Sequence, residues 1–367
     1  MKNRARTALI LVIFLLIQLL PWALVASPIF IFAEYDYNLN NIKSEIEELS
    51  KEILCMTAAL QYPFQFEKNP DGTYTVTGIE RTMVKKGQEY RLIYEEIIVP
   101  SIYKGKPVTK IGDEAFKSLS DLKTVLIPKT ITHIGNGAFA DCYFLKTVTM
   151  PETLDYLGER AFYNCQNLEG ITIPEGITEI GAATFYWCFN IKALTIPEGV
   201  TSIGASAFSG CKLETVNFPE GLITIEGNAF KGTNLTSLDL PDSVRSIGFQ
   251  AFAMTPITEF TSPASLETTG DAPFWYCHKL KTATFNSGIQ KIYRGMFHCC
   301  SSLTDLYLPA DVEMIETYAF NGCTSLRRIH FAGTVSEWEA IEKEDQWNSE
   351  LKNCTVICTN GEINISE

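Results

Sequence analysis

An alternation of apolar and polar positions that returns every 22 or 23 residues dominates the chain from residue 111 to residue 331. In one period, apolar residues occupy positions 1, 4 and 6 of Leu145–Met150 and Pro151 follows, which predicts a short strand with one face toward a core. A second apolar pair, Leu154 and Leu157, predicts the other wall of a coil. One period cannot bury these side chains alone, so the pattern predicts stacked coils that share one core. The phenylalanines in phase are Phe116, Phe139, Phe162, Phe185, Phe208, Phe230, Phe252, Phe274, Phe297 and Phe320.

Three successive periods are one residue shorter than the others. After Phe208, Phe230 and Phe252 the next strand begins five residues later instead of six. The same loop is shortened each time, which predicts a local change in the geometry of the coils.

The N-terminus has the pattern of an export signal. Residues 7–33 are uncharged, and Lys2, Arg4 and Arg6 precede them. The apolar stretch fits a cleaved signal peptide, and at about 1.5 Å per helical residue it is also long enough to cross a ~30 Å hydrocarbon layer as a retained anchor. Both alternatives place the basic flank inside and the rest of the chain outside the cytoplasm.

Residues 34–62 have helical periodicity. An apolar stripe with spacings of 4-3-4-3-4 runs along one face, and most of the charged side chains lie off it. We expect the stripe to pack onto the end of the solenoid; pairing with a second copy of the chain is the alternative. The stripe consists of Ile42, Ile46, Leu49, Ile53, Met56 and Leu60.

The consensus of the periods is LxxLxLPxxLxxIGxxAFxxCxx, and through it the chain resembles the BspA-like family of bacterial 23-residue leucine-rich repeats over residues 70–365. Thr73–Ile79 and Ile97–Lys110 are similar to the family's incomplete first repeat, and the segment from Phe331 to Gly361 is similar to its closing cap. Glu226 and Glu316 depart from the pattern, because they replace the glycine of the Ile-Gly pair. The resemblance implies surface-exposed recognition or adhesion and names no ligand.

The predicted fold class is therefore an α/β-poor repeat solenoid: a right-handed leucine-rich repeat solenoid with short parallel strands, about ten full repeats, capping segments and an N-terminal hydrophobic helix. The predicted parts of the chain are a signal peptide or membrane anchor (1–33), an amphipathic helix (34–62), an N-terminal cap with an incomplete repeat (63–110), the leucine-rich repeats (111–331) and a C-terminal cap (332–367).

Seven of the eleven cysteines lie three residues after a repeat phenylalanine. A fixed place in the coil predicts a ladder of small buried side chains with free thiols, because side chains that point the same way in register cannot bridge without displacing the coils. No cysteine and histidine spacing fits zinc, so we expect no metal.

No catalytic constellation is recognisable. The four histidines are dispersed, and the chain contains no GxSxG, HExxH or phosphate-binding glycine loop. The glycines of the Ile-Gly pairs are interpreted as repeat-phased turn residues. We therefore expect no enzyme activity and no cofactor. The formal net charge of −13 disfavours nucleic acid and anionic lipid surfaces as ligands.

The side chains at positions 3 and 5 of each predicted strand should point outward, so we expect the binding surface among them. They are mostly small and rich in threonine, except in the C-terminal repeats, where Asp305, Tyr307, Arg328 and His330 combine charge with an aromatic ring. This set is the first candidate partner site. The second candidate comprises the aromatic residues that follow two repeat phenylalanines: Tyr186, Trp187, Trp275 and Tyr276.

The sequence thus predicts an exported surface protein that binds a protein or a glycan without catalysis, and that contacts a membrane only through its N-terminal segment. The alternatives are a passive spacer of the cell envelope and a non-catalytic module of a secreted enzyme system. We expect a monomer, with dimerisation through residues 42–60 as the alternative.

Overall fold

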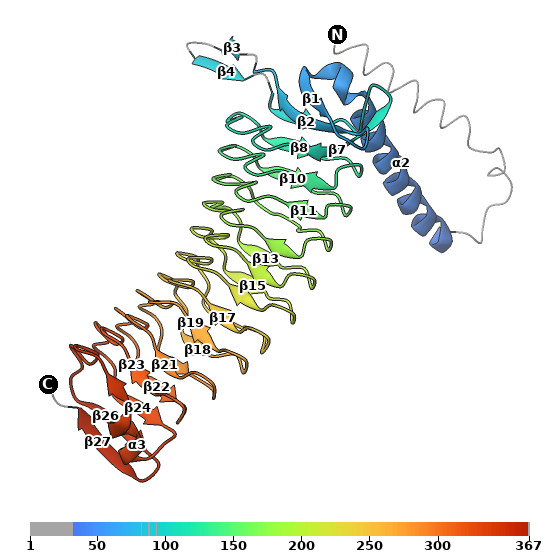
Figure 1. The fold of residues 1–367 in the computed structure, drawn as a ribbon. Coiled ribbons are helices and arrows are strands. Elements are labelled where there is room, and N and C mark those ends of the chain that lie inside the picture. Colours follow the sequence, from blue (N-terminus) through green and yellow to red (C-terminus); the bar gives the residue numbers. More distant parts are fainter. Residues whose placement is uncertain (1–31, 82, 87–88, 93, 366–367) are drawn as a thin grey trace. The chain divides into compact units, whose positions relative to one another are not determined.

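The computed structural model describes residues 32–81, 83–86, 89–92 and 94–365 (Figure 1). The chain divides into two compact units, residues 1–51 and 52–367. Helix α2 (Phe32–Gln61) begins in the first unit and ends in the second. The predicted signal peptide or anchor lies outside the described residues except for its last two positions. Among the described residues, no helix combines the length and the apolar character needed to span a membrane.

The second unit is a solenoid in which each turn adds short parallel strands to those of the turn before (Figure 1). The first ladder is formed mainly by the strands that end before the repeat prolines, and the C-terminal cap extends it. Its strands are β5 (Glu96–Ile98), β8 (Thr124–Leu126), β10 (Thr147–Thr149), β13 (Ala193–Thr195), β15 (Thr215–Asn217), β18 (Glu259–Thr261), β20 (Thr282–Thr284), β22 (Asp305–Leu308), β24 (Arg328–Phe331), β26 (Cys354–Cys358) and the antiparallel β27 (Gly361–Ile365).

The second ladder contains the strands that end near the Ile-Gly pairs, together with the N-terminal cap. Its strands are β1 (Phe64–Lys68), β2 (Tyr74–Ile79), β7 (Lys106–Ile111), β9 (His133–Ile134), β11 (Tyr156–Leu157), β12 (Glu179–Ile180), β14 (Ser202–Ile203), β16 (Thr224–Ile225), β17 (Ser246–Ile247), β19 (Thr268–Thr269), β21 (Lys291–Ile292), β23 (Met314–Ile315) and β25 (Glu342–Lys343). Strand β6 (Ile102–Tyr103) pairs with β7, and β3 (Met83–Lys86) pairs with β4 (Glu89–Leu92).

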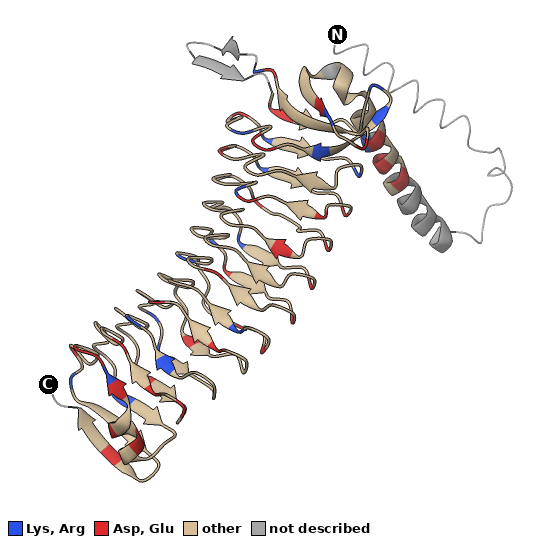
Figure 2. Cartoon of the chain, viewed as in Figure 1, with Lys and Arg blue, Asp and Glu red and all other residues tan. Residues whose placement is uncertain are grey.

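The expected alternation along the first ladder is confirmed. In β10, Thr147 and Thr149 are exposed and Val148 is buried. The ladder has two gaps: residues 233–240 of one shortened repeat form no strand, and a full-length repeat has only the isolated bridge from Gly170 to Thr147. Because a gap also occurs in a repeat of full length, the local change in geometry at the shortened loops stays a prediction. Charged residues of both signs are distributed along the turns rather than gathered in one stripe (Figure 2).

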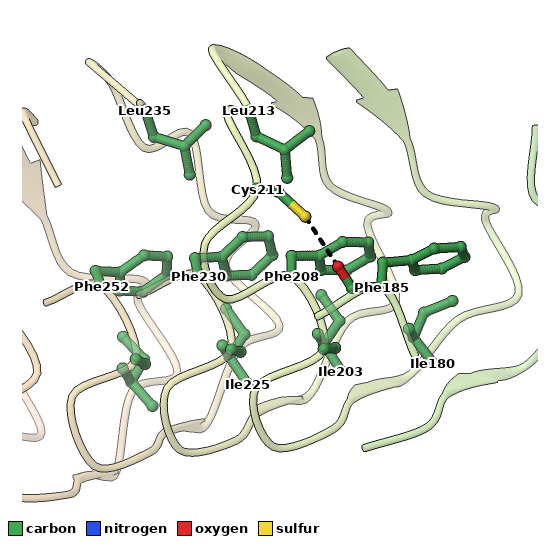
Figure 3. Packing of buried hydrophobic residues seen from close by; sticks show 14 of the residues in the cluster. Ile180, Phe185, Ile203, Phe208, Cys211, Leu213, Ile225, Phe230, Leu235 and Phe252 are labelled. Atoms are coloured by element: carbon green, nitrogen blue, oxygen red, sulfur yellow. Dashed lines mark hydrogen bonds between the residues drawn. The ribbon is translucent and has the colours of Figure 1, made fainter. Parts of the chain in front are cut away.

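The repeat phenylalanines form one continuous stack in the core (Figure 3). All ten are fully buried, and successive rings lie 5.2–6.2 Å apart with interplanar angles of 24° or less. At the two ends the stack meets an edge-on ring, Phe64 of β1 at 6.2 Å and Trp347 of the C-terminal cap at 6.2 Å. These two rings cover faces of the stack that would otherwise meet solvent.

The prediction of free, mostly buried thiols is confirmed, since all eleven cysteines are free and nine are buried. The structure adds a role that the sequence did not indicate. Each ladder thiol donates to the carbonyl oxygen of the phenylalanine one repeat earlier, as Cys211 Sγ does to Phe185 O at 3.1 Å (Figure 3). Burial raises the pKa of Cys142 and Cys211 to about 12 and that of Cys277 to about 11. The remaining members of the ladder are Cys165, Cys188, Cys300 and Cys323.

This burial predicts a simple labelling pattern. In the native protein, iodoacetamide should modify only Cys299 and Cys358, the two partly exposed cysteines, whereas in denaturant all eleven should react. Peptide mass spectrometry after timed alkylation measures the outcome. Modification of Cys188 at the rate of Cys358 in the native protein would contradict the buried ladder.

The Ile-Gly glycines are not the left-handed turn residues of the repeat. Positive φ angles fall two residues before and two residues after each phenylalanine, as at Arg160 (φ 55°) and Asn164 (φ 59°) around Phe162. Gly135 and Gly248 have no such angle, and they are small because the preceding coil's backbone passes close to them: a Cβ on Gly248 would lie 2.4 Å from Gly227 N. The interpretation of these glycines as turn residues is confirmed, because a turn begins at the glycine, as where Gly248 O accepts from Ala251 N at 3.2 Å. A positive φ is not the reason for the glycine. Close approach between coils is the physical reason for them.

The two glutamates that replace the glycine of the Ile-Gly pair each make a compensating contact. Where Glu226 replaces the glycine, its Oε2 accepts from the backbone N–H of Ala205 at 2.9 Å. Where Glu316 replaces it, Oε2 accepts from the N–H of Arg294 at 2.7 Å. In both places a carboxylate satisfies a backbone donor of the preceding coil.

The apolar stripe of the helix does not pack onto the solenoid as expected. Within the second unit, α2 buries Cys55 and Ala58 against Ile98, and Cys55 O accepts from Ser101 N at 3.0 Å. Met56 and Leu60 of the stripe are 54% and 89% exposed. The expectation is wrong for these residues, because the small side chains on a neighbouring face allow a closer approach.

The C-terminal cap closes the core with two tryptophans. Helix α3 (Val335–Ala340) begins with a capping box in which the Thr334 side chain and Glu337 bond each other's backbone N–H. Trp338 of this helix lies edge-on to Phe331 at 5.4 Å and to Trp347 at 6.1 Å. The helix thereby covers the last turn of the core beside strand β26.

Candidate functional site

The outward side chains of β22, β24 and β26 form two parallel columns. The register pairs Asp305 with Arg328 in one column and aligns Tyr307, His330 and Ile357 in the other. The sequence nominated the first four residues from their phase alone, and the structure places them in contact. We call Asp305, Tyr307, Arg328 and His330 the C-terminal face.

Asp305 is the electrostatic centre of the C-terminal face. Arg328 donates to it from Nε at 2.5 Å and from Nη2 at 3.0 Å, and His330 Nε2 lies 3.3 Å from its Oδ1. The hydrogen bonds from Arg328 are the main reason why the pKa of Asp305 is lowered to about 2. With only 14% of its side chain exposed, Asp305 holds Arg328 in one place as a charged pair.

Tyr307 and His330 form an aromatic stack beside this pair. Their rings are nearly parallel, 4.3 Å apart with an interplanar angle of 6°. Tyr307 is 39% exposed, while His330 is half-buried between the tyrosine ring and the carboxylate of Asp305. The stack is therefore held in place and still open to a ligand.

A shallow apolar groove of about 460 Å³ adjoins the stack. Tyr307 and His330 form one side, and Phe331, Ile357 and Cys358 extend the apolar lining into the cap. The sequence analysis missed the contribution of the cap. The signal that could have found it is the alternation in Cys354–Cys358, which continues the outward column with Ile357.

The second predicted set does not join the first. Tyr186, Trp187, Trp275 and Tyr276 lie on the turns after the repeat phenylalanines, in two pairs on different repeats. Tyr186 and Trp187 stack at 5.0 Å, and Trp275 and Tyr276 meet edge-on at 4.7 Å. Lys231 Nζ lies over the Trp275 ring at 5.6 Å.

The C-terminal face combines charged, aromatic and apolar groups. Asp305 and His330 are in contact, but His330 forms no hydrogen bond to a serine, threonine or cysteine side chain in the described part of the chain. Within that same part, no group of three or more His, Cys, Asp or Glu side chains could hold a metal ion. The face offers a fixed charge pair, a ring stack and an apolar groove, which together suit contact with a partner molecule.

Comparison with known proteins assigns the repeats. The family described as BspA type Leucine rich repeat region matches residues 109–235 and 223–343, with six copies. No curated protein matches the chain. A leucine-rich repeat protein from Bacteroides ovatus is similar in structure, with 24% identity over 81% of this chain and 89% of that one and a TM-score of 0.51.

A second solved structure, a leucine rich cell surface protein from Faecalibacterium prausnitzii, shares 27% identity over 76% of this chain and 96% of that one, with a TM-score of 0.49. The match to the repeat family covers more than half of the chain and coincides with the stacked phenylalanines and the two strand ladders. The chain belongs to the BspA-type leucine-rich repeat family.

Proposed function

We propose that this chain is an exported surface protein that binds a partner protein through the C-terminal face. The observation that supports this most is the position of the Tyr307–His330 stack, between a fixed Asp305–Arg328 pair and an apolar groove. Contact hot spots combine these features: a well-packed aromatic anchor, an arginine and an apolar pocket beside them.

Export is supported by the sequence of the N-terminus. The basic residues before the uncharged stretch 7–33 fit a secretory signal or an anchor that leaves the repeats outside the cytoplasm. The free, buried thiols are compatible with either side of the membrane, because their burial protects them from oxidation.

The two alternatives predict different behaviour of the C-terminal face. A passive spacer would need no fixed charge pair and would tolerate its removal. A non-catalytic module of a secreted enzyme system would hold an enzyme subunit as its partner, which is a special case of the same proposal. We assign the chain no catalytic role, and turnover of peptide or glycan substrates by the purified protein would contradict that assignment.

Capture of surface proteins tests the proposal. Immobilised full-length chain should retain a partner from solubilised surface proteins, and the Tyr307→Ala/Arg328→Ala variant should bind that partner at least about tenfold more weakly. The partner should also protect Cys358, which lines the groove, from iodoacetamide.

The matched control changes two outward residues of the same ladder far along the solenoid. Thr147→Ala/Thr149→Ala alters exposed positions in the register of β10 and should leave capture unchanged. Equal capture by the wild-type chain and by Tyr307→Ala/Arg328→Ala would favour the spacer and overturn the proposal.

A further inference from the structure

A second aromatic surface lies on the turns of the solenoid, away from the strands that form the C-terminal face. We call Tyr163, Tyr186, Trp187 and Phe189 the aromatic ledge. Tyr163 and Tyr186 stack at 5.1 Å with an interplanar angle of 6°, Tyr186 continues to Trp187 at 5.0 Å, and Trp187 to Phe189 at 6.3 Å. The rings thus form one unbroken run across two adjacent repeats.

The backbone at Trp187 is unfavourable for a large side chain. Its φ is 59°, in the left-handed region, and the equivalent position of most other repeats holds glycine, as at Gly210, or a short side chain such as Asn164. Met254 and Tyr276 are the other large side chains at this position. The indole is also 42% exposed, so burial in the core does not account for it. A strained backbone that presents an exposed ring points to a role for the ring itself.

The indole ring of Trp187 packs against the neighbouring coil. A Cβ on Gly210 would lie 2.5 Å from Cδ1 and 3.1 Å from Nε1 of Trp187, so the indole rests directly on the glycine backbone. Among the described residues, Trp187 Nε1 donates no hydrogen bond, which leaves its N–H available to a ligand. The ring is therefore held in place before any ligand binds.

Two side-chain amides, Asn164 and Gln166, lie beside the aromatic ledge. Gln166 Nε2 donates to Asn164 Oδ1 at 3.0 Å, and Asn164 Nδ2 donates to Asp141 Oδ1 at 2.9 Å. The backbone N–H of Asn164 donates to Tyr186 O at 2.6 Å, which brings this chain of amides to the edge of the aromatic ledge. Asn164 is buried, so its amide holds Gln166 in place, and the amide oxygen and second N–H of the partly exposed Gln166 remain for a ligand.

We propose that the aromatic ledge, together with Gln166 as positioned by Asn164, binds a neutral polysaccharide. Aromatic rings pack against the C–H faces of sugar rings, and amides match hydroxyl groups, which both donate and accept. The one carboxylate in the network, Asp141, accepts from Asn164 and keeps its negative charge, which disfavours an anionic polymer, while the amides suit an uncharged glycan. This site is independent of the proposed function, because other residues form it and its ligand belongs to another chemical class.

The chain contains a matched control for the proposal. Tyr276 has the same φ of 59° and is 46% exposed, and Trp275 precedes it as Tyr186 precedes Trp187. The neighbours of Trp275 carry or can acquire charge: Lys231 lies over its ring, and His298 stacks on it at 6.5 Å. This pair therefore presents similar exposed rings without the amide network.

Affinity electrophoresis of the full-length chain in nonionic detergent tests the proposal, with soluble starch, xylan, galactomannan or mixed-linkage β-glucan cast in the gel. The wild-type chain should be retarded in at least one of the four gels. Trp187→Gly should weaken that binding about tenfold and Gln166→Ala by a smaller factor, while Trp275→Ser/Tyr276→Gly should bind as the wild type does.

Glycine suits a φ of 59°, so Trp187→Gly should unfold at the same or a higher urea concentration than the wild type. If it unfolds more easily, Gln166→Ala decides the question, because it removes an exposed-edge amide and no core contact. The proposal is overturned if no gel retards the wild type, if neither Trp187→Gly nor Gln166→Ala weakens binding, or if the control pair weakens it equally. Loss of a captured protein partner in Trp187→Gly, with no polysaccharide bound by the wild type, would assign the aromatic ledge to protein recognition instead.

Discussion

Replacing Phe208 with alanine is expected to lower the free energy of unfolding by about 3–5 kcal/mol. The ring is fully buried and stacks on Phe185 and Phe230 at 5.5 and 5.4 Å. Its removal leaves a cavity between coils whose spacing is fixed by backbone hydrogen bonds, such as that from Phe208 N to Ala229 O at 2.8 Å. The coils cannot collapse into the cavity without breaking those bonds. The loss of unfolding free energy therefore falls in the upper part of the range that is usual for large-to-small substitutions in a core.

The effect should extend beyond one repeat, because each coil of a solenoid is stabilised by its two neighbours. Urea unfolding followed by far-ultraviolet circular dichroism measures the change. Phe249→Ala, which removes the same side chain from a position that is 49% exposed, should change the stability by no more than about 0.5 kcal/mol. Equal losses of unfolding free energy in the two variants would show that a ring in the buried stack contributes no more to stability than an exposed ring does.

The phase of the repeat explains why the stack and the C-terminal face could be predicted from sequence. Residues separated by one period occupy the same place in successive coils, so Phe208 must lie beside Phe185 and Phe230. The same rule, combined with the alternation of strand residues, correctly placed Asp305 beside Arg328 and Tyr307 beside His330. Neither inference requires knowledge of how far apart the coils are.

The part of the groove formed by the cap could not be predicted in this way. Ile357 and Cys358 follow an irregular segment that contains α3, so no period relates them to Tyr307. Their place depends on how Trp338 and Trp347 pack against the last coil, and that packing is a matter of shape rather than of phase.

Helix α2 shows another reason why sequence patterns fail to predict packing. Its apolar stripe is well marked, yet the buried residues within the second unit are Cys55 and Ala58. Large apolar side chains give the stronger signal in a sequence, whereas close packing against Ile98 favours small ones. The exposed stripe residues keep dimerisation through residues 42–60 a prediction, which sedimentation of the full chain would test.

The second prediction of a large effect on stability concerns the glycines of the Ile-Gly pairs. Sequence alone assigned them to turns by their phase in the repeat, and glycine is common in turns because it tolerates a positive φ. In the structure their φ angles are ordinary, and the reason for glycine is the distance to the preceding coil, which no single repeat reveals. Gly248 is the strictest case, since a Cβ there would lie 2.4 Å from Gly227 N and 2.5 Å from the carbonyl carbon of Glu226.

Gly248→Ala is therefore expected to destabilise the solenoid by about 3 kcal/mol, because the added methyl group meets backbone atoms that cannot rotate away. Relief requires the two coils to separate, which would lengthen the hydrogen bond from Gly248 N to Ile225 O, now 2.7 Å. Urea unfolding should show a lower midpoint, and amide hydrogen exchange should increase first in β16 and β17, the strands on either side of the contact.

Gly170→Ala provides the matched control. No atom lies within 4 Å of a Cβ at Gly170, and its φ is not in the left-handed region, so alanine should fit without strain. Alanine restricts the backbone of the unfolded chain more than glycine does. The free energy of unfolding should therefore stay unchanged or rise by up to about 1 kcal/mol. If Gly248→Ala is tolerated as well as Gly170→Ala, the coils are not held at the distance that these contacts imply. The turn alone would then account for these glycines.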